Sequence, residues 1–271
     1  MSLQAIKPIF RLSAFSPKAF TSLEKNFHIF LQRWFLNSFE IVVQPVLYFV
    51  AFGFGLQKWI GSIDGLAYPT YVLTGILMAT AMSTSIYESA QGVYQRYFIG
   101  DLYLLLKTCP VRFEHMLFGE FLWSVFRATL AFSILLIIGS SLDLIAVTDF
   151  LPLIAICIWL CIFFASLGLL LTSLVKTYSQ VYQYLPLIVI PQFLFCGVFF
   201  PIERLPETIA KICSVLPVSI AVDWARDGSF MDNPILSFSY VLLYLLFSFF
   251  MFNIASKRIS EILERNSEVM K

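Results

Sequence analysis

The chain has 271 residues, of which 59% are hydrophobic and only 13% are charged, and its mean hydropathy is +0.83. Because a soluble domain carries roughly 25% charged residues, this composition excludes an ordinary soluble protein and predicts an integral membrane protein. The net charge of +1, without a long basic run, gives no indication of nucleic-acid binding.

The N-terminal tail, residues 1–37, begins with scattered charges and no continuous apolar core. We therefore expect no signal peptide, and a first span that directs insertion itself. Apolar side chains then recur near helical spacing from Leu23 to Phe35, with Lys25 and Arg33 among them and Trp34 suited to the head-group level. This pattern predicts an amphipathic helix on the cytoplasmic interface. The alternative is the first turns of a tilted span.

Six segments are apolar over the roughly 20 residues that a helix needs to cross the hydrocarbon region. They predict an all-α membrane fold with spans at 38–57, 68–92, 116–139, 150–175, 181–200 and 235–255, followed by a tail at 256–271. The third span contains Glu120 and Arg127, and the fifth contains Pro186 and Pro191, so these two spans are the least regular.

The positions of lysine and arginine predict the orientation, because cytoplasmic loops are enriched in both. Most of the 18 basic residues fall on one side: Lys7, Arg11, Lys18, Lys25, Arg33, Arg96, Lys107, Arg112, Lys176, Lys257, Arg258, Arg265 and Lys271. The other side has only Lys58, Arg204, Lys211 and Arg226. Both termini are therefore expected in the cytoplasm, which requires an even number of spans.

Three ionisable residues fall within predicted spans: Glu88, Glu120 and Arg127. Because a charged side chain inside the membrane is energetically costly, such residues usually have a function. Glu120 and Arg127 are seven residues apart and therefore share one helix face, and the neighbouring span can bring Glu88 close to them. Two interpretations remain open. The residues form a polar patch that gates a path or contacts a charged substrate, or they form a network that holds the helices together near the cytoplasmic interface.

Small residues recur at every fourth position of the second span, at Gly75, Ala79 and Ser83. Such a ridge favours close helix packing. The alternative is a stripe that lines a pore.

A cluster of tyrosines, Tyr178, Tyr182 and Tyr184, stands at the start of the fifth span. Aromatic side chains of membrane proteins commonly face lipid or form interfacial belts. The alternative hypothesis is an aromatic wall for an amphiphilic or glycan cargo.

The outer stretch 201–234 is neither a span nor a polar loop. Pro201, Pro206 and Pro217 divide it into two short amphipathic pieces, near 207–216 and 218–227. Short apolar helices bounded by prolines can enter the membrane and return where their backbone is sheltered. The pattern predicts a re-entrant helical hairpin that caps the outer end of a pathway, or else an interfacial hairpin without that role.

Residues that could support catalysis or hold a cofactor are scarce. The two histidines, His28 and His115, lie outside the apolar segments, so no span offers a haem ligand or a Ser-His pair. There is no paired acidic magnesium motif and no P-loop, so we expect no catalytic site, no metal and no cofactor in this chain. The five cysteines show no zinc spacing, and only a Cys196–Cys213 disulfide remains conceivable.

The cytoplasmic connection at 94–115 contains an unusually apolar helix candidate, "GDLYLLLKTCP". Asp101 is a good N-cap, and Pro110 ends the helix. An exposed apolar helix away from any span typically marks a contact with a partner.

This stretch resembles the coupling helix of ABC-2 type exporter permeases, E-x-G-T-L-E-x-L-L-x-(A/T)-x-P. The positions that fit are Gly100, Leu102, Leu105, Leu106, Thr108 and Pro110. Where that family has acids, this chain has Tyr97 to Ile99 and Tyr103. The blocks "GEFLWSVFRATLAF", "FASLGLLLTSLVKTY" and "FLFCGVFFPIERLPETIAKICSVLPVSIAVDWAR" also resemble the nodulation-type lipo-oligosaccharide exporters of that family, so the likeness covers about 31–255.

The resemblance implies six spans, an interface helix and an outer re-entrant hairpin in one domain. It also implies a homodimer in the bacterial cytoplasmic membrane, paired with two separate ATPase subunits that bind ATP and magnesium. The expected role is export of an amphiphilic cargo such as a lipid-linked saccharide, glycolipid or hydrophobic drug. A non-transporting scaffold and an intramembrane lipid-modifying enzyme are the alternatives.

Overall fold

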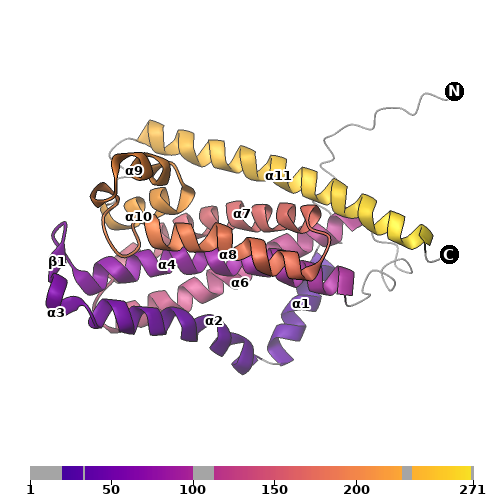
Figure 1. The fold of residues 1–271 in the computed structure, drawn as a ribbon. Helices are drawn as coiled ribbons and strands as arrows, with labels where there is room; N and C mark the ends of the chain where they lie inside the picture. The colour runs from indigo at the N-terminus through magenta and orange to yellow at the C-terminus, as the bar shows by residue number, and fades with distance from the viewer. Residues whose placement is uncertain (1–19, 33, 100–112, 228–233, 270–271) are drawn as a thin grey trace.

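The computed structural model describes residues 20–32, 34–99, 113–227 and 234–269, and these form an almost wholly helical protein (Figure 1). The first part contains α1 (Phe20–Gln32), α2 (Trp34–Tyr48), the π-helix η3 (Phe49–Phe54), α3 (Gln57–Ile60), the antiparallel strands β1 (Ser62–Ile63) and β2 (Leu66–Ala67), α4 (Tyr68–Tyr87) and the π-helices η4 (Glu88–Gly92) and η5 (Gln95–Ile99). The second part contains α6 (Phe113–Ser141), the 3-10 turn η6 (Val147–Asp149), α7 (Phe150–Leu174), α8 (Tyr178–Phe195), the 3-10 turn η7 (Ile202–Arg204), α9 (Glu207–Ser214), α10 (Pro217–Asp227) and α11 (Pro234–Val269).

Three of the described helical segments are long and apolar enough to cross a membrane, which makes this a membrane protein. They are α6, the η6–α7 segment Val147–Leu174 and the part of α11 from Pro234 to Leu263. The bent pair α9–α10 could count as a fourth. The expected spans at 38–57, 68–92 and 181–200 fall on α2–η3, α4–η4 and α8, which do not reach that length and apolarity. Six spans therefore stay a prediction.

Helix α4 lies at the centre of the bundle and contacts α2, α6, α7, α8 and α10. Sixteen of its 20 residues are buried, because it is covered on nearly all sides. Helix α11 packs along α7 (Figure 1) and exposes much of its apolar surface, including Phe238, Leu243 and Phe250. A helix with that exposure is suited to contact with lipid.

Helix α7 approaches the π-helix η4 closely at Gly168. A Cβ on Gly168 would lie 2.0 Å from Ser89 Oγ and 2.8 Å from the carbonyl oxygen of Ile86. One turn further on, Thr172 Oγ1 donates a hydrogen bond to the carbonyl oxygen of Ala90 at 3.1 Å. A π-helical turn disturbs the regular hydrogen-bond ladder of a helix. Thr172 therefore supplies η4 with a partner, and the small Gly168 allows the approach.

The small-residue ridge of α4 serves two different surfaces. A Cβ on Gly75 would lie 2.6 Å from the carbonyl oxygen of Val198, so Gly75 permits a close backbone contact. Ala79 and Ser83, one and two turns later, line the cavity described below. Close packing is therefore seen at Gly75, while a pore-lining role for the ridge stays a prediction.

The outer stretch forms two short helices, α9 and α10, that meet at an angle of 83°. Pro201 and Pro206 are the residues that precede η7 and α9, and Pro217 is the first residue of α10. Proline suits these positions because it lacks the N–H that would be unsatisfied in a first turn. Cys196 and Cys213 are free and buried.

At the N-terminal side, α1 and α2 are separate helices that lie at a clear angle to each other (Figure 1). Helix α1 packs against α6, where the rings of Phe30 and Trp123 have centroids 5.9 Å apart. The predicted coupling helix, Gly100–Pro110, lies outside the described residues.

Candidate functional site

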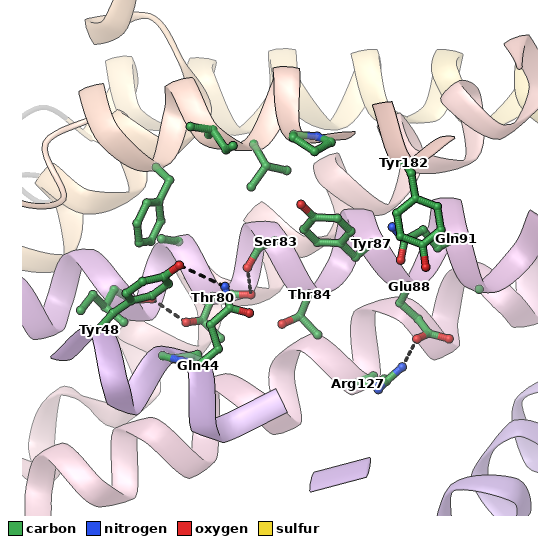
Figure 2. A pocket seen from close by; sticks show the side chains of 18 of the residues that line it. Gln44, Tyr48, Thr80, Ser83, Thr84, Tyr87, Glu88, Gln91, Arg127 and Tyr182 are labelled. Carbon is green, nitrogen blue, oxygen red and sulfur yellow. Dashed lines mark hydrogen bonds and ion pairs between the residues drawn. The ribbon is translucent and has the colours of Figure 1, made fainter. Parts of the chain in front are cut away.

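A large cavity of about 820 Å³ opens beside α4 (Figure 2). Its floor is formed by α4, η4 and η5, and its two walls come from α2 and α8. Arg127 of α6 reaches it from below the floor in the view of Figure 2. Its volume falls within the range of about 300–1,000 Å³ that is common for small-molecule sites.

The lining changes in chemical character along α4. Towards the start of α4 the lining is mainly apolar but includes the Gln44 amide and the Tyr48 hydroxyl. The apolar side chains at this end are Pro45, Ile76, Ala79, Val189, Ile190 and Phe193. The middle of the floor carries the hydroxyl groups of Thr80, Ser83 and Thr84. The far end contains amide and charged groups: Gln91, Gln95, Glu88, Arg96 and Arg127. We call these the apolar end and the charged end. The cavity thus combines apolar, hydroxyl, amide and charged groups in one lining.

Two of the three predicted wall tyrosines lie in this cavity. Tyr178 and Tyr182 line it, with their hydroxyl oxygens 3.2 Å apart and their ring centroids 4.9 Å apart. Tyr184 is absent from the lining, because two further residues along a helix turn a side chain to another face. Tyr48 of α2, on the opposite wall, and Tyr87 of α4, on the floor, also line the cavity.

At the charged end, Glu88 is 95% buried because η4 turns it toward α6. Its Oε1 accepts hydrogen bonds from Arg96 Nη1 at 2.9 Å and from Trp123 Nε1 at 3.0 Å. Its other oxygen, Oε2, is ion-paired with Arg127 (Figure 2). A buried carboxylate is tolerated when it is paired and hydrogen-bonded in this way.

Glu120 is fully buried one layer further from the cavity. Its carboxylate lies 2.7 Å from Arg96 Nη2. It also accepts hydrogen bonds from Asn26 at 2.7 Å, Ser22 at 3.0 Å, Tyr97 at 3.3 Å and Lys25 at 3.4 Å. Glu120 therefore connects α6 to α1 and η5, and Arg96 joins it to Glu88. We call Glu88, Glu120, Arg96, Arg127 and Lys25 the ionic cluster.

The two cations outside the spans differ in their electrostatic environment. Burial by itself lowers the pKa of the Arg96 guanidinium, but Glu120 and Glu88 hold that pKa above its usual value. Burial lowers the pKa of the Lys25 ammonium, and the attraction of Glu120 only partly offsets this effect. Arg96 is therefore the stronger partner of Glu120.

The sequence identified Glu88, Glu120 and Arg127 as a group but did not find the residue that joins them. Arg96 had been assigned to the cytoplasmic connection, and no motif marks it. Arg96 lies eight residues after Glu88, and this spacing predicts their contact only when the π-helices η4 and η5 are known. The polar partners on α1, among them Ser22 and Asn26, carry no sequence signal of their own.

Long apolar helices around a polar-lined cavity define a helical membrane protein. Residues 18–230 match the profile of the ABC-2 type transporter family. The chain belongs to that family, and membership implies an ABC ATPase as partner.

Several curated proteins are similar to this chain. Nodulation protein J of Rhizobium leguminosarum bv. viciae is 27% identical over 219 residues, which cover 77% of this chain and 82% of that protein. Nodulation protein J of Azorhizobium caulinodans is 24% identical over 216 residues, covering 80% and 85%. The inner membrane transport permease YadH of Escherichia coli K12 is 20% identical over 229 residues, covering 84% and 89%.

Proposed function

We propose that this chain is the transmembrane permease subunit of an ATP-driven exporter that moves an amphiphilic cargo outward across the bacterial cytoplasmic membrane. The observation that carries the proposal is the cavity, whose lining changes from apolar side chains to hydroxyl, amide and charged groups. In this arrangement the apolar end holds the lipid-like part of the cargo. The polar part lies along Tyr178, Tyr182 and the floor of α4.

The proposed assembly is a homodimer with six spans per copy, both termini in the cytoplasm and two separate ATPase subunits below. ATP and magnesium bind to the ATPases, and the helix predicted at Gly100–Pro110 transmits their movement to the spans. The cycle is a switch between two states, biased by nucleotide in the partner. The ionic cluster supports this scheme, because η5 precedes the coupling stretch and Arg96 of η5 holds both Glu88 and Glu120.

A lipid-linked saccharide or glycolipid is the preferred cargo class. Hydroxyl and amide groups suit the hydroxyls of a sugar, and exposed tyrosine rings offer apolar faces to its C–H surface. The resemblance to nodulation-type permeases supports the same preference. A hydrophobic drug would use the apolar end without needing the hydroxyl-lined floor.

The experiment compares the membrane and extracellular lipids of a deletion strain with those of the same strain carrying the intact chain, by mass spectrometry. We expect one amphiphilic species to accumulate inside the deletion strain and to disappear from the outside. Complementation by the intact chain should reverse both changes. An unchanged lipid and glycan profile, with the partner ATPase present and the chain expressed, would contradict an export function for this class of cargo.

A further inference from the structure

Aromatic rings from four segments, α2, η3, α8 and the segment that follows α8, pack against one another beside the apolar end of the cavity. Phe193 of α8 lines the cavity and packs against Tyr48 of α2, with ring centroids 5.2 Å apart. Beyond Phe193, Phe199 lies 5.2 Å from it and 4.6 Å from Phe52 of η3, measured between ring centroids. These four rings, Tyr48, Phe52, Phe193 and Phe199, form what we call the aromatic seal. Phe199 is its last member in chain order, and it follows the end of α8 outside any helix.

Phe199 is carried by a short irregular segment, Cys196–Pro201, that follows α8. The segment turns at Gly197, whose φ of +79° suits glycine. Val198, next to Phe199, is fully buried. Because the segment has no regular hydrogen-bond ladder of its own, its position depends on contacts from elsewhere in the molecule.

Arg226 of α10 supplies such contacts. Its Nη2 donates to the carbonyl oxygen of Val198 at 3.3 Å and to that of Tyr71 at 2.8 Å. Its Nε donates to Thr74 Oγ1 at 3.2 Å, and the guanidinium carbon lies 3.4 Å from the centroid of the Tyr71 ring. One side chain thus ties the outer hairpin, the start of α4 and the segment that carries Phe199.

The surroundings favour a guanidinium at this place. Asp64, Glu203 and Asp223 line a small pocket of about 70 Å³ beside Arg226, so the local charge is complementary to a cation. A planar guanidinium donates from several nitrogens in fixed directions and can also lie on an aromatic face, which an ammonium group cannot reproduce. Gly75 contributes by its small size, since a Cβ there would lie 3.1 Å from Arg226 Nη2.

We propose that Arg226 is a positioning residue for transport, which holds the outer hairpin and Phe199 in place over the apolar end of the cavity. The inference rests on the proposed export function, because release of cargo to the outside then requires this contact to open. Arg226 is not among the residues that line the cavity. It acts through the carbonyl oxygen of Val198 and through the aromatic seal beside it.

The test uses Val198→Cys as a reporter, in the full chain with Cys196→Ala and Cys213→Ala. A membrane-impermeant maleimide added to the outer side of intact cells measures how often the buried position 198 becomes accessible. Adding Arg226→Gln should raise the labelling rate at least tenfold. Arg226→Lys should raise it similarly, because charge alone does not rebuild the three contacts. Thr74→Val removes one acceptor and should raise it severalfold.

Lys211→Gln is the matched control, since Lys211 is a cation of the same hairpin that pairs with exposed Glu207 on its own helix. It should leave labelling at the parent rate. If Arg226→Gln is folded and labels at the parent rate, the proposal is overturned. If Arg226→Gln does not fold, the labelling rate of Thr74→Val tests the proposal instead. A labelling rate equal to that of the parent would overturn the proposal.

The second readout separates this role from simple stabilisation. In the assembled complex, Arg226→Gln should keep basal ATP hydrolysis within twofold of the parent while export falls at least fivefold. Equal losses of both activities would overturn the positioning role. The labelling rate at position 198 is measured without any export readout. If the complex exports nothing, the proposed export function is wrong. The labelling experiment would still test the contact between Arg226 and the carbonyl oxygen of Val198.

Discussion

Nη2 of Arg96 lies 2.7 Å from Oε2 of Glu120, and the other terminal nitrogen of the same guanidinium lies 2.9 Å from Glu88. One cation thus serves two carboxylates, of which Glu120 is fully buried and Glu88 nearly so. This pairing turns three separate helical elements, η4, η5 and α6, into a single polar unit at the charged end of the cavity. It also reaches α1 through the hydrogen bonds of Glu120 with Ser22 and Asn26.

Glu120→Ala should destabilise the protein strongly, because the half-buried Lys25 loses its carboxylate partner and the half-buried Arg96 keeps only Glu88. Removing one member of a buried ion pair costs about 3–5 kcal/mol in the free energy of unfolding. Thermal unfolding in detergent would measure the change. Glu207→Ala is the control, since its pair with Lys211 is solvent-exposed and should contribute little. Similar effects of both changes would contradict the structural importance of the ionic cluster.

Gly168→Ala should lower the thermal stability, because its Cβ would collide with Ser89 Oγ across the contact between α7 and η4. Ser89→Ala alone should be nearly neutral, since the Ser89 hydroxyl bonds only to the nearby carbonyl oxygen of Ile86. The double variant should recover part of the loss, because the nearest atom is gone while the Ile86 carbonyl still crowds the site. If the change in melting temperature of the double variant equals the sum of the changes in the two single variants, Gly168 and Ser89 are not in contact.

Thr172→Val should reduce the free energy of unfolding by about 1 kcal/mol, because the buried hydroxyl shares its proton between the carbonyl oxygens of Ala90 in η4, at 3.1 Å, and Gly168 in α7, at 3.0 Å. Thr172→Ser keeps the hydroxyl and should stay close to the parent. Chemical denaturation of the two variants, measured side by side, would decide. If valine and serine behave alike, the hydroxyl contributes nothing to η4.

Tyr182→Ala should impair export, because Tyr182 lines the cavity and its hydroxyl oxygen contacts that of Tyr178. We expect a loss of fivefold or more in cargo-stimulated ATP hydrolysis by the assembled complex, as for the loss of a contact of about 1 kcal/mol. Tyr184→Ala is matched in chemistry, and its position lies outside the cavity lining, so stimulation should persist. Equal responses of both variants would remove Tyr182 from the proposed cargo path.

Leu105→Asp and Leu106→Asp should each abolish assembly with the partner ATPase, because an aspartate would have to be desolvated in an apolar docking surface. Tyr103→Glu is the control, since it restores an acid that the resembled family carries at that position. Co-purification and ATPase stimulation provide the measurement. If the complex still co-purifies and ATPase stimulation persists in both leucine variants, Gly100–Pro110 is not the coupling helix.

Local features of the fold could be predicted because they depend on short stretches of sequence. The prolines at 201, 206 and 217 predicted two outer helical pieces near 207–216 and 218–227, and the structure has helices at Glu207–Ser214 and Pro217–Asp227. The third and fourth expected spans coincide with α6 and α7 within about three residues at each end. The last helix, α11, runs well beyond the predicted limit at residue 255, because its later turns are polar and the hydropathy signal ends before the helix does.

The sequence by itself determined the membrane class, the long apolar helices, the two short helices after Pro206 and the motifs of the family, since composition, periodicity and proline positions act locally. Only the tertiary structure decided which distant groups meet. It placed Tyr182 in the cavity and Tyr184 outside it, paired Glu88 and Glu120 through Arg96, and brought Arg226 to the carbonyl oxygen of Val198. The reason is physical: a charged side chain selects its partner by distance and burial, and both arise from helix packing that no local pattern encodes.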